Sequence, residues 1–135
     1  MRRLALRIEY DGGRFNGWQV QPDGRTVQGA VEEALFRTTG ERRRVTGASR
    51  TDSGVHAEGQ VAHLDTASEL PIDRFVPALN YWLPDDVSVL ECHTVAADFD
   101  ARRHAVSKLY RYRILRSNVR HPLREGRTMR VWRPL

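Results

Sequence analysis

The sequence of 135 residues contains a single cysteine, a single lysine and no long apolar run. A membrane-spanning helix needs about 20 consecutive apolar residues, so we expect no transmembrane segment. The basic residues after Met1 are not followed by an apolar stretch, which argues against a signal peptide. Cys92 has no second cysteine to pair with and lies in an alternating apolar segment. We therefore expect it to be a small buried side chain in a protein of the reducing cytoplasm.

The sequence also lacks a group of residues spaced as metal ligands. His63 and Asp65 lie two positions apart, and no third ligand stands with His56 at a usual spacing. Asp52, Ser53 and His56 include the residue types of a hydrolytic triad, but they crowd into one loop without the Gly-x-Ser-x-Gly turn. We expect neither a bound metal nor triad chemistry.

Arginine, in contrast, is abundant: 21 of the 22 basic residues are arginines. Residues 1–101 hold 11 basic and 16 acidic residues, a net charge of −5, whereas residues 102–135 hold 11 basic and one acidic, a net charge of +10. Arginine forks suit phosphate recognition and base stacking, so RNA is the natural partner. On charge alone, a solvated face in an arginine-rich composition explains the pattern equally well.

The hydrophobic pattern predicts an α+β fold. Alternating apolar residues indicate strands, and apolar residues at helical spacing indicate helices. The strands are expected over 3–10, 44–48, 60–66, 87–95 and 109–115, and the helices over 27–38 and from about 73–76 to 83. The economical arrangement is a ferredoxin-like antiparallel sheet with both helices on one face. We expect the other face to be an unpaired apolar surface that associates with something.

One loop, at residues 49–57, carries a dense mix of reactive side chains. Asp52 is flanked by the hydroxyls of Thr51 and Ser53, and Gly54 allows a tight turn there. Arg50 is close enough in sequence to hold the Asp52 carboxylate ionised. Asp52 is therefore a candidate nucleophile or base. The alternative is that it caps a turn through its own backbone amides.

Tyr110 precedes Arg111 in the fifth expected strand. Such a tyrosine most often belongs to a core or a sheet face. If its face is open, a flat ring beside arginines suits stacking on an RNA base.

The segment 50–57 resembles the catalytic motif of the tRNA pseudouridine synthase A family. Further blocks in that family's usual order lie at 8–12, 15–19, 26–28, 80–86, 99–102 and 108–112. The resemblance implies that Asp52 is the essential aspartate, that Arg50 is its ion-pair partner and a wedge at the vacated base position, and that Tyr110 stacks on the target uracil. It implies a substrate-binding role for Thr51, Ser53, Gly54, His56 and Arg111.

The implied function is conversion of uridine to pseudouridine at positions 38 to 40 of the tRNA anticodon stem-loop, with no cofactor and no metal. Attack at C6, attack at C1′ and assisted elimination all remain open as routes. A non-catalytic RNA-binding α+β module and an inactive truncated product are the alternatives. The first is disfavoured because the central strand at 59–65 carries no aromatic residue for stacking.

Family members are about twice as long, with a second, similar half that closes the cleft. We therefore expect residues 1–116 to be the first half of the catalytic domain, and 117–135 to be a basic irregular tail leading toward the second. The expected partners are tRNA and either another copy of the chain, as a homodimer, or the missing C-terminal half. No membrane association is expected.

Overall fold

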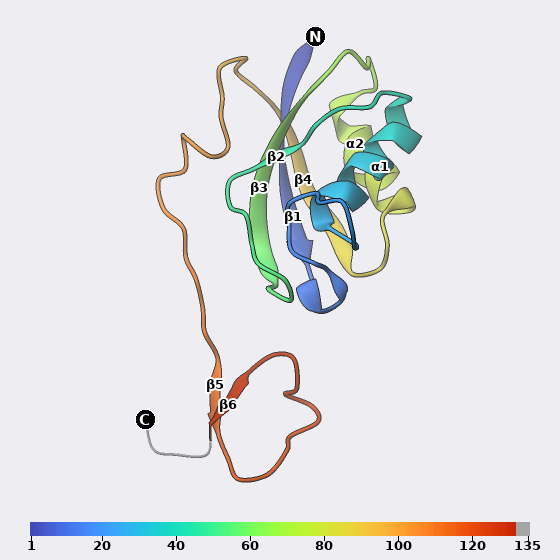
Figure 1. Ribbon diagram of the computed structural model, residues 1–135. Helices are drawn as coiled ribbons and strands as arrows, with labels where there is room; N and C mark the ends of the chain where they lie inside the picture. Colours follow the sequence, from blue (N-terminus) through green and yellow to red (C-terminus); the bar gives the residue numbers. More distant parts are fainter. Residues whose placement is uncertain (132–135) are drawn as a thin grey trace. The chain divides into compact units, whose positions relative to one another are not determined.

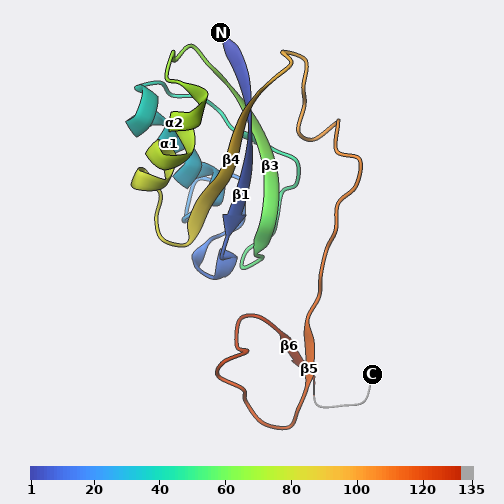
Figure 2. The same cartoon turned by 180° about the vertical axis from the view of Figure 1, so that it is seen from behind.

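A four-stranded antiparallel sheet with two helices on one of its faces forms the main part of the protein (Figure 1). The computed structural model describes residues 1–131. In chain order the elements of this part are β1 (Arg2–Tyr10), the short 3-10 helix η1 (Gly12–Arg14), α1 (Val27–Thr39), β2 (Thr46–Gly47), β3 (Ala57–Thr66), α2 (Ile72–Trp82) and β4 (Val87–Val95). The sheet order β2-β3-β1-β4 confirms the expected ferredoxin-like fold, and both helices lie on the same side of the sheet in the opposite view as well (Figure 2).

Helix α1 begins and ends where its sequence signals predict. The Thr26 hydroxyl accepts a hydrogen bond from the Gly29 N–H at 3.2 Å, which satisfies one of the free donors of the first turn. Gly40 follows the last turn in the left-handed conformation that ends many helices. Helix α2 begins directly after Pro71 and ends before Leu83.

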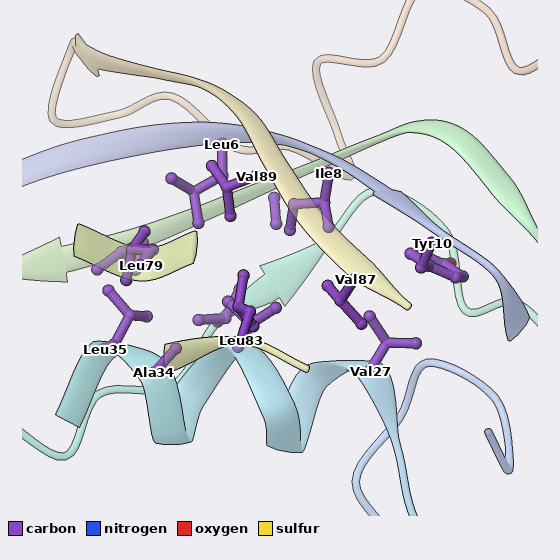
Figure 3. Close-up of a cluster of buried hydrophobic side chains, with 14 of the residues drawn as sticks. Leu6, Ile8, Tyr10, Val27, Ala34, Leu35, Leu79, Leu83, Val87 and Val89 are labelled. Carbon is purple, nitrogen blue, oxygen red and sulfur yellow. The ribbon is translucent and has the colours of Figure 1, made fainter. Parts of the chain in front are cut away.

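The core lies between the sheet and the two helices (Figure 3). Alternate residues of β1 point into it, because successive strand residues face opposite sides of a sheet. Its labelled members in Figure 3 are Leu6, Ile8, Tyr10, Val27, Ala34, Leu35, Leu79, Leu83, Val87 and Val89. Cys92 is buried at its margin, as predicted, and burial raises the pKa of its thiol to about 11.

The face of the sheet away from the helices is charged, so the prediction of an unpaired apolar face is wrong. Arg3 forms a two-point ion pair with Asp65, at 2.9 and 3.1 Å, and Arg7 pairs with Glu91. The cause is the strand alternation itself: in β1 Arg3, Arg7 and Glu9 alternate with the buried residues. Arg3 lies opposite Asp65 of β3, and Arg7 lies opposite Glu91 of β4.

The segment 97–104 covers part of this charged face. The Phe99 carbonyl accepts a hydrogen bond from the Arg3 guanidinium at 2.6 Å, and the Ala101 N–H donates to Nδ1 of His63 at 3.0 Å. The rings of Phe99 and His63 meet edge to face. Ala101 is consequently buried, although it lies in an irregular segment.

A second unit begins at Val106, and its described residues form two short strands, β5 (Ile114–Arg116) and β6 (Met129–Val131), which pair in parallel. The expected strand at 109–115 is therefore mostly wrong, because only its last two residues are extended in a ladder, and that ladder is not part of the main sheet. Leu109 and Tyr112 are largely exposed, so the alternation of this segment has no core to bury it within residues 1–131. The last four residues of the predicted basic tail, 132–135, lie outside the described residues.

Candidate active site

The loop between β2 and β3 lies against the segment that follows β1, and backbone hydrogen bonds join the two. The Trp18 N–H donates to the Thr51 carbonyl at 3.1 Å, and the Gly54 N–H donates to the Phe15 carbonyl at 3.2 Å. The Ser53 hydroxyl donates to the same Phe15 carbonyl. The loop that carries Asp52 is thus held in place by residues nearly 40 positions earlier in the chain.

Side chains and one glycine complete this attachment. The hydroxyls of Tyr10 and Thr51 lie 2.7 Å apart, and the Gly12 N–H donates to Nδ1 of His56 at 2.9 Å. A Cβ atom on Gly12 would lie 1.9 Å from the Val55 carbonyl oxygen, so only glycine permits the close approach of the two segments. His56 therefore connects the loop to Gly12.

The turn at Asp52 is closed by backbone atoms. The Val55 N–H donates to the Asp52 carbonyl at 3.1 Å, and Gly54 has a φ of 81°, which confirms its expected role in a tight turn. Within residues 1–131 the Asp52 carboxylate accepts no hydrogen bond from the turn. The turn-capping alternative for Asp52 therefore finds no support, and the carboxylate stays available to a ligand.

A pocket of about 430 Å³ opens beside this turn. The residues that line it all carry polar side chains: Asn16, Gln19, Gln21, Arg50, Thr51, Asp52 and Ser53. Arg50 and Asp52 are both exposed, and in the described part of the chain neither forms an ion pair. The structure brings them to one pocket without the expected contact between them, so their ion pair remains a prediction.

A second group of interactions supports the pocket from the side of β4. Arg25 forms two hydrogen bonds with Asp86, at 2.7 and 2.8 Å, and its guanidinium lies 3.9 Å from the centre of the Phe15 ring. The Arg25 hydrogen bonds hold the pKa of the Asp86 carboxyl below its usual range. The Asp86 carbonyl in turn accepts from the Asp11 N–H at 3.0 Å. This group fixes the segment against which the Asp52 loop packs.

The other predicted site residues are placed differently. Tyr110 and Arg111 belong to the second unit, so their predicted roles stay predictions. Gly54 and His56 lie in the loop but do not line the pocket. The three amides at 16, 19 and 21 were not predicted as site residues, although Gln19 lies within one of the blocks that carry the resemblance. Among the described residues, no three histidines, cysteines or carboxylates lie close enough together to hold a metal ion.

The pocket combines a carboxylate, a guanidinium and carboxamides, which together contact flat molecules that both donate and accept hydrogen bonds. Fold and pocket together define an α+β domain with a pocket suited to a polar organic ligand. No helix within residues 1–131 is long and apolar enough to cross a membrane.

Comparison with known proteins gives the family. The family model described as tRNA pseudouridine synthase matches residues 7–102, and the chain belongs to this family. It is 47% identical to the tRNA pseudouridine synthase A of Myxococcus xanthus over 135 residues, which are 100% of this chain and 51% of that protein. The enzymes of the same name from Halalkalibacterium halodurans and Acetivibrio thermocellus are 48% and 49% identical, with 100% and 97% of this chain and 52% and 54% of those proteins covered. The chain thus spans about half the length of these curated relatives.

Proposed function

We propose that this chain supplies the catalytic carboxylate, Asp52, of an enzyme that converts uridine to pseudouridine in tRNA. One observation carries the proposal: in a chain of this family, the Asp52 carboxylate is exposed beside Arg50 in a pocket large enough to admit a flat ring. The relatives are named as tRNA pseudouridine synthases, which supports tRNA as the substrate.

The reaction is an isomerisation, in which every atom of the substrate is kept. The bond from N1 of uracil to C1′ of the ribose breaks, and a bond from C5 to C1′ forms. C5 loses its proton, and N1 gains one. Atoms and electrons balance without an oxidant, a reductant or a co-substrate, so the task of the protein is to bind, orient and activate.

Asp52 meets the chemical need for a nucleophile that also leaves easily. Its carboxylate can bond transiently to C6 or C1′, or it can assist departure of the base while the ring turns to present C5. Each of these routes needs the carboxylate within contact distance of the same edge of the pyrimidine. An exposed carboxylate at a fixed turn suits that requirement, because the base can reach it without displacing another side chain.

The target base must leave the RNA stack before Asp52 can reach it. Extruding a base costs a few kcal/mol, which contacts in the pocket must offset. Arg50 occupies the gap left in the stack, and Tyr110 supplies a flat ring for the extruded base. The pairing of Arg50 with Asp52 belongs to this bound state.

The target is a uridine at positions 38 to 40 of the anticodon stem-loop. The ten basic residues among 102–131 support binding of its phosphates, since they stand against a single acidic residue. The pocket is enclosed from the other side by a further polypeptide. This is either a C-terminal half like the one that completes the length of the relatives, or a second copy of the chain in a homodimer.

The test compares a protein of the relatives' length that contains residues 1–135 with its Asp52→Asn variant on unmodified tRNA. We expect the parent to form pseudouridine, and we expect the variant to lose several orders of magnitude in rate while it keeps its affinity for tRNA. Turnover by the variant within tenfold of the parent would refute the role of Asp52. Binding without any turnover by the parent would favour the RNA-binding module instead.

A further inference from the structure

We propose that Gln19 is a substrate-binding residue whose carboxamide holds the N3–H and a neighbouring carbonyl of the target uracil. The proposal rests on the proposed function, because it assigns a ligand to the pocket that contains Asp52. Gln19 lines that pocket together with Arg50 and Asp52, on the opposite segment of the chain.

The backbone on both sides of Gln19 is fixed relative to the Asp52 loop. The Trp18 N–H donates to the Thr51 carbonyl, and the Trp18 carbonyl accepts from the Gln28 N–H at 3.0 Å. The Val20 N–H donates to Oε1 of Gln28 at 2.9 Å. Trp18 itself is buried, with its ring directly against Gly47. The backbone of Gln19 is therefore held in place relative to the Asp52 loop, even though the Gln19 side chain is exposed.

Of the other two amides of the pocket, Gln21 is hydrogen-bonded and Asn16 is packed against Gly24. Gln21 donates from Nε2 to the Asn16 carbonyl at 2.6 Å, and the Asn16 amide lies so close to Gly24 that a Cβ there would be 1.7 Å from Nδ2. Within residues 1–131 the Gln19 carboxamide makes no hydrogen bond. It can turn toward a ligand without breaking an existing contact.

The other charged and hydroxyl side chains of the pocket are less suited to this edge of the base. Arg50 only donates hydrogen bonds, while the hydroxyls of Thr51 and Ser53 are engaged with Tyr10 and with the Phe15 carbonyl. Asp52 must face C6 or C1′, and N3 lies across the ring from C6. A carboxamide offers an acceptor for N3–H and a donor for the adjacent carbonyl, so Gln19 has the chemistry that this edge requires.

The test is a binding experiment with two RNAs in an Asp52→Asn background, so that turnover does not interfere. One RNA is an anticodon stem-loop with the target uridine, and the other has an abasic site at that position. We expect Gln19→Leu to weaken binding of the uridine RNA about tenfold, the effect of losing one good hydrogen-bonded contact, and to leave binding of the abasic RNA unchanged. Asp23→Ala, in the same exposed loop, is the matched control and should change neither.

Gln19→Glu is a second variant, for use if the leucine side chain perturbs folding. It keeps an acceptor and the length of the side chain but loses the donors and adds a negative charge that repels the phosphates of both RNAs, so it should weaken binding of the uridine RNA more than binding of the abasic RNA. Equal weakening of both RNAs, or no weakening of either, would overturn the proposal. If the parent with intact Asp52 makes no pseudouridine, the proposed function fails, while the comparison of the two RNAs still decides whether Gln19 contacts the base.

Discussion

Arg50 and Asp52 line one pocket from positions two apart on an exposed loop, yet they do not pair within the described part of the chain. An ion pair in water contributes at most about 1 kcal/mol, so an exposed guanidinium has little reason to stay on the carboxylate. Once RNA excludes water from the pocket, the same pair becomes stronger. We infer that the contact between Arg50 and Asp52 forms when the base enters.

This view predicts the effect of Arg50→Lys. Lysine keeps the charge but lacks the planar fork that can contact a carboxylate at two points and stack between bases. We expect single-turnover pseudouridine formation to fall at least about tenfold, with tRNA affinity changed little. The measurement is the single-turnover rate at saturating enzyme. A rate close to that of the parent would show that the positive charge of residue 50 is sufficient for the reaction.

Individual residues also show what the sequence could and could not predict about the site. Asp52, Arg50, Thr51 and Ser53 were found because they lie together in one loop with a distinctive order. The amides of Asn16, Gln19 and Gln21 were missed, since they reach the pocket only through hydrogen bonds such as that from Trp18 to Thr51. No period or spacing in the sequence encodes such a contact between distant loops.

At the scale of elements, periodicity predicted what a buried core enforces. Strand β4 has the predicted bounds, and α1 is one residue longer than predicted, because each has one face against the core. The segment 109–115 alternates in the same way, but Leu109 and Tyr112 are largely exposed. Alternation thus predicts a strand only where another element covers its apolar side.

The segment 97–104 depends on one buried histidine. His63 accepts the Ala101 N–H through Nδ1, and burial lowers the pKa of its ring, with a smaller effect from Arg3. Asp65 and Asp100 face it and act in the opposite direction. The folded state therefore binds a proton less readily than the unfolded chain, so this contribution to stability is complete above the unfolded pKa near 6.5 and is lost as pH falls toward the lowered folded value.

We expect the free energy of unfolding of residues 1–135 to decrease between pH 7.5 and 5, and we expect His63→Asn to make this decrease smaller. Asparagine does not titrate, and its carbonyl can still accept from the Ala101 N–H. Its loss of packing should cost about 1 kcal/mol at pH 7.5. Urea unfolding at the two pH values measures both effects. The other histidines are unchanged in this comparison, so an unaltered pH dependence would exclude His63 as its source.

At the scale of the whole molecule, the charged open face changes the argument for a partner. The open face is not an apolar surface that needs to be covered by a partner. It carries the ion pairs Arg3–Asp65 and Arg7–Glu91, which can remain in contact with water. What still calls for a partner is the pocket, whose carboxylate and guanidinium are both exposed. The chain also spans about half the length of its curated relatives.

We therefore expect residues 1–135 alone to form no pseudouridine in unmodified tRNA. Without a second wall, water competes at the reacting carbons and screens the contact between Arg50 and Asp52. If the chain is divided as we expect, into a catalytic half at 1–116 and a basic tail at 117–135, this polypeptide should still bind tRNA. Its affinity should then fall steeply with salt, because bound counterions are released. The measurement is the mass of the purified chain in solution together with a pseudouridine assay on the same sample. Activity in a self-associated form would mean that a second copy closes the pocket, whereas robust turnover by a strict monomer would show that one half is enough.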